Sequence, residues 1–241
     1  MTEIIQGRAG DVLLLCDHAS NAVPPGIELG IAPELLDLHI AVDLGAGPLT
    51  RGLAAALDAP AILATVSRLA IDLHRESDHA GLIPHRSDGH AIPGNRNADR
   101  QDRIARFHAP YHRTIRDRVR AQRPALVLSI HSFTPCLEQG GTDRPWEVGI
   151  LYNRDARAAL PAIAWLRGQG LITGDNEPYS GRMLNATLNR HAEGQGIPSI
   201  AIEVRNDLIR DKRGIERWTC TLEGLTNSLR NSLARKGAPA T

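Results

Sequence analysis

The sequence is poor in cysteine, in aromatic residues and in net charge, and each shortage excludes a class of protein. Its three cysteines, Cys16, Cys136 and Cys220, lie far apart and form no CxxC pair, which argues against a disulfide framework or a thiolate zinc site. Aromatic residues make up only 3% of the chain, too few for the stacking platforms that bind single-stranded nucleic acid. The 28 basic and 27 acidic side chains nearly cancel, so no overall field favours nucleic acid or a membrane surface.

Long apolar runs are missing as well. No stretch approaches the length that crosses a bilayer, and the N-terminus lacks the charged and apolar regions of an export signal. We therefore expect a cytoplasmic protein without a membrane or nucleic-acid partner. The 241 residues show no repeat, linker or break in composition, which favours a single domain over residues 1–241. Nothing in the pattern indicates an oligomeric state.

Short apolar runs alternate with helical patterns along the chain. The predicted strands are 11–16, 61–66, 126–130, 148–152 and 199–204, and the predicted helices are 32–44, 47–57, 99–122, 156–168, 186–193 and 214–234. This alternation indicates an α/β fold with a parallel or mixed sheet. The stretch 81–97 is rich in Pro, Gly, Asn, Asp and His, and it predicts a functional loop.

Three of the predicted strands end in side chains that can bind a metal or transfer a proton. His18 follows the first strand, His131 follows the central one, and Glu203 lies near the end of the last. Ligands of open α/β sheets bind beyond the carboxyl ends of the strands, so these side chains should meet at one edge. Two imidazoles and a carboxylate suit zinc with an open position for water, and a further carboxylate could act as a general base.

Asp43 and two arginines complete this set. Asp43 lies on the predicted helix 32–44, and Arg68 and Arg75 follow the strand 61–66. An arginine can stabilise the oxyanion that forms when a carbonyl compound is hydrolysed. A lone histidine, however, is more often a structural residue than a ligand. By themselves, the residues leave a metal hydrolase and a purely structural arrangement both open.

Six segments resemble, in the same order, the signature blocks of the N-formylglutamate amidohydrolase family. The resemblance extends from about Leu13 to Leu208, and six co-linear blocks are more specific than any one of them. The segments are CDHASN at 16–21, HIAVDLGA at 39–46, SRLAIDLHR at 67–75, SIHSFTP at 129–135, NEPYS at 176–180 and IEVRNDL at 202–208. The family is similar to zinc carboxypeptidases and aspartoacylases. The resemblance therefore implies a phosphorylase/hydrolase-like three-layer sandwich with a central mixed, mostly parallel sheet.

The resemblance also implies an activity and individual roles. Members hydrolyse the amide of an N-formyl or N-acyl amino acid, so a small-molecule substrate of this class and one Zn²⁺ are expected. His18 and His131 match the two metal-binding histidines, and Glu203 matches the glutamate that activates water. Arg68 resembles the arginine that stabilises the oxyanion. Arg75 resembles the arginine that pairs with the substrate carboxylate, a task that suits a planar guanidinium.

The sequence departs from the relatives at two positions. Asn21 occupies the place of a glutamate three residues after the first histidine. Because a neutral amide is a poor zinc ligand, we assign the carboxylate ligand to Asp43, with Asn21 as the alternative. His74 replaces an asparagine before the second arginine and bears on substrate selectivity. Tyr179 and Arg205 are further candidate substrate-binding residues, although Tyr179 could equally pack at a turn and Arg205 could pair with a neighbouring carboxylate.

Supporting roles are expected for three more residues. Asp72 should orient Arg68 or Arg75 rather than take part in the chemistry. Asp17 could hold an imidazole in place or simply cap a strand end. His39 is expected to be structural or to support the site from outside.

Two other functions remain open at this point. A peptidoglycan-type N-acetylmuramoyl amidase uses a similar order of His, carboxylate, His and Glu, although such an enzyme would need an export signal. A catalytically inactive small-ligand binding protein could also keep the cavity, and the departures at Asn21 and His74 leave room for it.

Overall fold

The computed structural model describes residues 2–140 and 143–237, and its centre is a mixed seven-stranded sheet. The strand order is β1-β3-β2-β6-β9-β7-β8. The strands are β1 (Thr2–Ile5), β2 (Val12–Cys16), β3 (Ala61–Ala64), β6 (Leu126–Phe133), β7 (Val148–Leu151), β8 (Thr173–Asp175) and β9 (Ser199–Arg205). Strands β3, β2, β6 and β9 pair in parallel, whereas β1 is antiparallel to β3 and β7 is antiparallel to β9. The predicted mixed, mostly parallel sheet is therefore confirmed.

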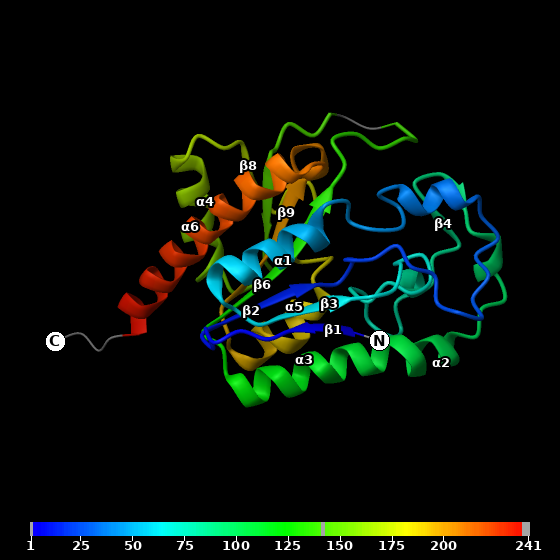
Figure 1. The fold of residues 1–241 in the computed structure, drawn as a ribbon, viewed down its shortest axis with the longest axis horizontal. Coiled ribbons are helices and arrows are strands. Elements are labelled where there is room, and N and C mark those ends of the chain that lie inside the picture. Colours follow the sequence, from blue (N-terminus) through cyan, green and yellow to red (C-terminus); the bar gives the residue numbers. More distant parts are fainter. Residues whose placement is uncertain (1, 141–142, 238–241) are drawn as a thin grey trace.

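Helices cover both faces of the sheet (Figure 1). One face carries α1 (Ala46–Leu57), α4 (Ala159–Gly168) and α6 (Lys212–Gly237), and the other carries α3 (Ala109–Gln122) and α5 (Ala186–His191). These layers make up the predicted three-layer sandwich. Among the described residues, no helix combines the length and the apolar character that a bilayer crossing requires.

Shorter elements connect these layers. Helix α2 (Arg100–Arg103) leads through one π-helical turn, Ile104–His108, into α3. The π-helical turn ends two residues before Pro110, which has no N–H to donate to the preceding turn. A small hairpin, β4 (Arg86–Ser87) and β5 (His90–Ala91), lies in the loop predicted over 81–97. The 3₁₀ helices are Pro33–Asp37, Ala80–Leu82, Pro93–Asn95, Glu193–Gln195 and Asn206–Ile209.

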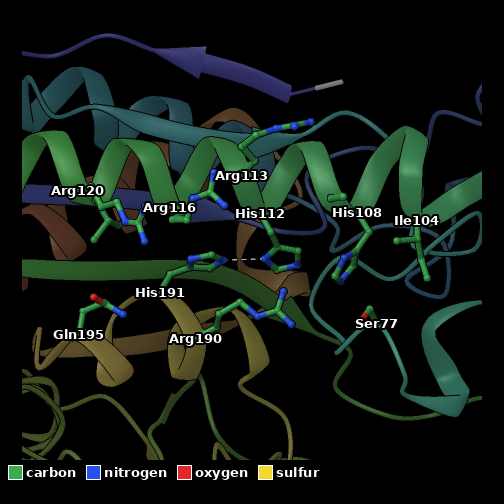
Figure 2. Close-up of a pocket in the computed structure, with 12 residues that line it drawn as sticks. Ser77, Ile104, His108, His112, Arg113, Arg116, Arg120, Arg190, His191 and Gln195 are labelled. Carbon is green, nitrogen blue, oxygen red and sulfur yellow. Dashed lines mark hydrogen bonds between the residues drawn. The ribbon is translucent and has the colours of Figure 1, made fainter. Parts of the chain in front are cut away.

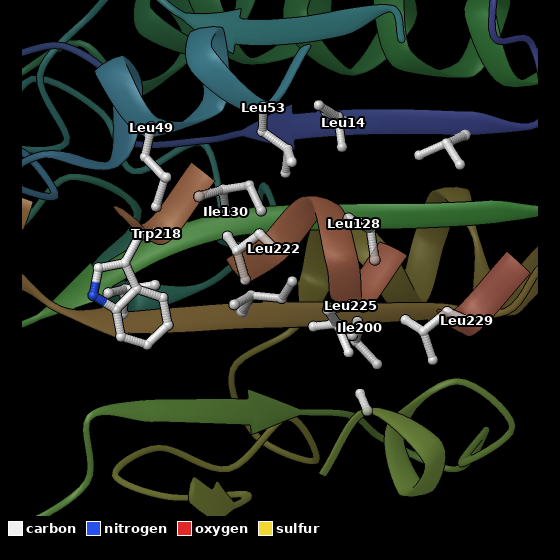
Figure 3. Packing of buried hydrophobic residues seen from close by; sticks show 14 of the residues in the cluster. Leu14, Leu49, Leu53, Leu128, Ile130, Ile200, Trp218, Leu222, Leu225 and Leu229 are labelled. Atoms are coloured by element: carbon white, nitrogen blue, oxygen red, sulfur yellow. The ribbon is translucent and has the colours of Figure 1, made fainter. Parts of the chain in front are cut away.

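The strands divide their side chains between two apolar layers. In β2, Val12 and Leu14 belong to the cluster that packs against α1 and α6, whereas Leu13 and Leu15 belong to the cluster beneath α3. Figure 3 shows the first cluster, where Trp218 and the leucines of α6 pack on the strands. A strand buried on both faces has a continuous apolar sequence, and this pattern made the strands recognisable.

The helix predicted over 32–44 is wrong. The chain forms only the 3₁₀ turn Pro33–Asp37, and Leu38 is already extended. The backbone beyond it bonds to other segments: the N–H of Asp43 donates to the carbonyl of His18, and the N–H of Arg68 donates to that of Ala41. Tertiary hydrogen bonds thus replace the helical ladder that the apolar spacing suggested.

Candidate metal centre and active-site cavity

The central strand carries its histidine inside the sheet rather than beyond it. Strand β6 continues to Phe133, and its pairing with β9 places His131 directly opposite Glu203. Both side chains are buried. Extended pairing between these two strands therefore fixes an imidazole and a carboxylate at the same level of the sheet.

Asp43 lies between the two predicted metal-binding histidines. Its Oδ2 is 3.2 Å from Nδ1 of His18 and 2.9 Å from Nδ1 of His131. The three donor atoms of this group lie within 4.8 Å of one another. Gly45 helps to place Asp43, because its φ of 82° turns the chain into α1 and a Cβ there would clash with Ile209. The structure thus gathers the three residues that were predicted to bind the metal.

Each of the two imidazoles uses its second nitrogen for another contact. Nε2 of His18 lies 2.7 Å from Oδ1 of Asp72, and Nε2 of His131 lies 2.9 Å from Oγ of Ser129. Asp17 lies 3.5 Å from the same nitrogen of His131. Metal-binding histidines in proteins usually donate their other N–H to a carboxylate, carbonyl or water, which fixes the ring orientation. The donor set and its surroundings therefore fit a divalent metal.

The surrounding charges hold these groups in their ionised forms. Burial opposes the charge on Asp43, but His18, His131 and Arg68 outweigh it and lower the pKa of Asp43. Burial also opposes the charge on His131, but hydrogen bonds with Asp17 and Asp43 outweigh it and raise the pKa of His131 well above its usual value. The carboxylates that stabilise these protons would stabilise a metal cation in the same way.

Arg68 bridges two of the carboxylates. Its guanidinium donates to Oδ1 of Asp43 at 2.9 Å and to Oδ2 of Asp72 at 3.0 Å. Arg75 lies farther from Asp72, at 3.8 Å, and both arginines line the cavity beside the histidines. The expected contact between Asp72 and the arginines is present, and Asp72 also contacts His18, which was not foreseen.

Glu203 is buried and incompletely bonded. Burial raises the pKa of Glu203 to about 7, and the nearby charge of His131 opposes this shift. Within the described part of the chain, its Oε2 has no hydrogen-bond partner. A carboxylate that exchanges a proton near neutral pH, with a free oxygen facing a polar cavity, is suited to general acid–base chemistry.

The cavity has a volume of about 290 Å³, and most of the predicted site residues line it. His74 and Tyr179 line it together with Phe133, Thr134 and Leu184. Nδ1 of His74 is 2.7 Å from Oδ2 of Asp17. The hydroxyl of Tyr179 accepts a hydrogen bond from Arg144, whose guanidinium also stacks over the ring.

Two residues named from the sequence lie elsewhere. Arg205 pairs with Asp207 at 2.8 Å and is not among the described residues that line the cavity. Asn21 donates to Asp37 at 3.2 Å and is likewise outside the lining. His39 does line the cavity, where it contacts Asp88 at 3.0 Å.

Sequence reasoning missed several partners of Asp17. Its carboxylate accepts hydrogen bonds from Tyr111 of α3 at 2.7 Å and from Thr187 of α5 at 3.2 Å, and Ser129 of β6 lies 3.4 Å away. Ser129 could have been found, because residues two apart on a strand point to the same face, as Ser129 and His131 do. The contacts from α3 and α5 depend on tertiary packing and leave no signal in the sequence.

Comparisons with known proteins identify the family. A model of the N-formylglutamate amidohydrolase family matches residues 10–210. A solved gene product from Agrobacterium tumefaciens is 30% identical, with a TM-score of 0.90 over 97% of this chain and 96% of that one. The N-formylglutamate amidohydrolase from Ralstonia eutropha is 20% identical and shares the fold, with a TM-score of 0.76 over 98% of this chain and 99% of that one. No curated protein matches the chain by sequence. This chain belongs to the N-formylglutamate amidohydrolase family and is a hydrolase of that type.

Proposed function

We propose that this protein is a metal-dependent amidohydrolase that cleaves a small N-formyl or N-acyl amino acid, with one Zn²⁺ held by His18, Asp43 and His131. One observation carries the proposal. Nδ1 of both histidines converges on Oδ2 of Asp43, while their Nε2 atoms contact Asp72 and Ser129. This is the arrangement of oriented imidazoles that a metal site requires.

Asp43 is a better carboxylate ligand than the alternatives. Asn21 has a neutral amide and bonds to Asp37 outside the cavity. Asp17 forms a second group of possible ligands with His74 and His131. However, Asp17 is not among the described residues that line the cavity, whereas Asp43 is, so a cation held by Asp43 would be accessible to a substrate. We therefore assign Asp17 to holding His74 and His131 in place.

Proton transfer is assigned to Glu203. The chemistry that a bound Zn²⁺ supplies in such a site is Lewis acidity, which polarises the scissile carbonyl and lowers the pKa of the attacking water. Glu203 takes the proton from that water and returns it to the nitrogen of the leaving amine. Its unpartnered Oε2 and its position opposite His131 support this role.

Arg68 and Arg75 are assigned to oxyanion stabilisation and to substrate binding, respectively. Arg68 lines the cavity beside Asp43 and keeps further N–H groups with which to stabilise the oxyanion. Among the residues that the structure describes, Arg75 has only a long contact to Asp72, so its guanidinium is available for a substrate carboxylate. His74 and Tyr179 line the same cavity and would contact the rest of the substrate. Arg205 has no role in this proposal, because its guanidinium pairs with Asp207 and it is not among the described residues that line the cavity.

The two other functions are less well supported. A cavity of about 290 Å³ has room for a small molecule, whereas a peptidoglycan strand would need an open groove. An inactive binding protein would have no need of a buried Glu203 beside a complete set of metal donors. The amidohydrolase accounts for both features.

Metal analysis and a substrate panel test the proposal. The purified protein should contain about one zinc per chain, and it should hydrolyse at least one member of a panel of N-formyl and N-acyl amino acids. Removal of the metal by a chelator should abolish hydrolysis, and added Zn²⁺ should restore it. Hydrolysis that survives exhaustive chelation would exclude the metal mechanism, whereas tight binding without turnover would favour the inactive binding protein.

A further inference from the structure

A second, larger cavity lies away from the proposed metal centre. Its volume is about 430 Å³, and it opens between α3 and the end of α5 (Figure 2). The two cavities have no lining residue in common. Volumes of this size are typical of small-molecule sites.

Arginines surround this cavity. Arg116 and Arg120 extend from α3, and Arg190 extends from the end of α5, beside the histidines, whereas the guanidinium of Arg113 extends from α3 away from His112 and His191 (Figure 2). Among the described residues that line it there is no aspartate or glutamate. Like charges three and four residues apart on a helix repel each other, so this arrangement is not explained by the stability of α3.

Two of these arginines form ion pairs with carboxylates that do not line the cavity, and the other two form no ion pair with the described residues. Arg190 pairs with Glu76, and Arg116 pairs with its sequence neighbour Asp117 at 2.9 Å. Within residues 2–140 and 143–235, neither Arg113 nor Arg120 forms an ion pair. The cavity therefore has guanidinium groups whose positive charge the protein itself does not compensate.

Three histidines form the buried wall of the cavity, and their hydrogen bonds fix the positions of their protons. Nε2 of His112 donates to the carbonyl of Leu73 at 3.0 Å, and Nε2 of His108 donates to the carbonyl of Arg75 at 2.9 Å. Burial and nearby cations lower the pKa of His112 to about 2, so its ring is neutral and its Nδ1 accepts. Nε2 of His191 must then donate to it, across 2.9 Å.

We infer that this cavity is a binding site for a small anion that carries carboxylate or phosphate groups. Guanidinium groups bind both kinds of oxyanion through paired, charge-assisted hydrogen bonds. The neutral imidazoles leave Nδ1 of His108 and His191 as acceptors, so a ligand that also carries a hydroxyl or amine would gain a further contact. A solvated helix face accounts for exposed arginines, but it does not account for a cavity with a wall of neutral histidines.

Calorimetric titration with two simple probes tests this site. Succinate and inorganic phosphate are titrated separately into the purified, metal-loaded protein at constant ionic strength, with chloride as the balancing ion. At least one of them should bind saturably with a stoichiometry of one. The probe that binds more tightly distinguishes a carboxylate ligand from a phosphate ligand.

Matched variants locate the bound probe. The double variant Arg116→Gln/Arg120→Gln should weaken binding by about tenfold or more, since each lost charge-assisted contact contributes on this scale. Arg118→Gln removes a charge from the same helix on the side of Gln6 and should change the affinity by less than about twofold. Arg75→Gln tests whether the probe instead occupies the metal cavity, and it should leave this binding intact.

Three results would overturn the inference. These are no saturable binding of either probe, unchanged binding in the double variant, and binding that depends on Arg75 alone. Circular dichroism checks that each variant is folded. The charge reversal Arg120→Glu provides a second test, because it leaves the buried wall untouched and should abolish binding of whichever probe binds to the wild-type protein.

Discussion

The two cavities use the same side chain in opposite electrostatic settings. At the metal centre, His18 and His131 face carboxylates that outweigh burial and raise the pKa of both imidazoles. Between α3 and α5, burial lowers the pKa of His112 to about 2 and that of His191 to about 4, and arginines reinforce the effect. Carboxylates thus surround the histidines of the first cavity, and arginines lie beside those of the second.

This difference shows why a histidine cannot be interpreted from its neighbours in the sequence alone. His131 follows an apolar stretch and His191 lies on a short helix, yet most of the partners that decide their protonation come from distant segments. Asp43 and Asp17 set the state of His131, whereas Arg190 and Arg116 act on His191. The charge that each cavity presents follows from tertiary contacts.

The largest expected effect concerns the acid–base residue of the metal cavity. Glu203→Gln should reduce kcat by about 10²- to 10⁴-fold, because the amide cannot accept the proton of the attacking water. Zinc content should stay at the wild-type level, since Glu203 is not a proposed ligand. Steady-state kinetics and metal analysis check both points. Glu216→Gln, an exposed change on α6, is the matched control. Undiminished turnover would remove Glu203 from the mechanism.

The second prediction concerns stability in acid. Between pH 6.5 and about 4 the unfolded chain protonates His191 while the folded protein does not, so the free energy of unfolding falls as the pH falls. Across this pH range, the protonation of His191 in the unfolded chain lowers the free energy of unfolding by roughly 3 kcal/mol. Denaturant unfolding at several pH values should show that His191→Gln is less sensitive to acid. His85→Gln, at an exposed position, should keep the wild-type slope. If the free energy of unfolding falls equally with pH in the wild type and both variants, His191 does not cause the acid sensitivity.

The third prediction separates substrate binding from chemistry in the metal cavity. Arg75→Gln should raise KM about 10- to 100-fold for substrates with a free carboxylate and change kcat much less, since a charge-assisted contact is lost. Substrates with that carboxylate esterified should show little change. Arg154→Gln, at an exposed position, serves as the control. Equal losses for both kinds of substrate would show that Arg75 has a different role.

The smallest effect tests whether the two helical layers are independent. Asp99 accepts from the N–H of Asp102 at the start of α2, and Asp211 accepts from that of Gly214 near the start of α6. Replacing either with Ala should cost about 1 kcal/mol and lower Tm by a few degrees. Thermal unfolding and kinetics are measured on both variants. A fall in kcat/KM for Asp99→Ala alone would show that the layer with the arginine cavity supports catalysis.

Much of the fold could be predicted because its signals are local. The buried strands have continuous apolar sequences, and the long charged helix before β6 has a clear pattern. By contrast, the sequence did not reveal the edge strands β1 and β8, which have four and three residues respectively. Short edge strands are only partly buried and carry a weak pattern.

The candidate site could be predicted in part. His18 and His131 were named from the strand ends and from the family blocks, Asp43 was assigned as the carboxylate ligand in place of Asn21, and the structure brings the three together. Asp43, however, reaches the site from a turn and not from the expected helix, because hydrogen bonds to other segments fix its backbone. Arg205 was named as a candidate substrate-binding residue, but in the structure its guanidinium pairs with Asp207, two residues away.

The chain from Asp72 to Arg75 separates the two cavities. The side chains of Asp72, His74 and Arg75 face the proposed metal centre, while the carbonyls of Leu73 and Arg75 accept hydrogen bonds from His112 and His108 on the opposite side. A ligand that shifted this stretch from one side would alter affinity on the other, and thermodynamic linkage makes any such influence equal in both directions. Four residues of backbone thus contact both cavities.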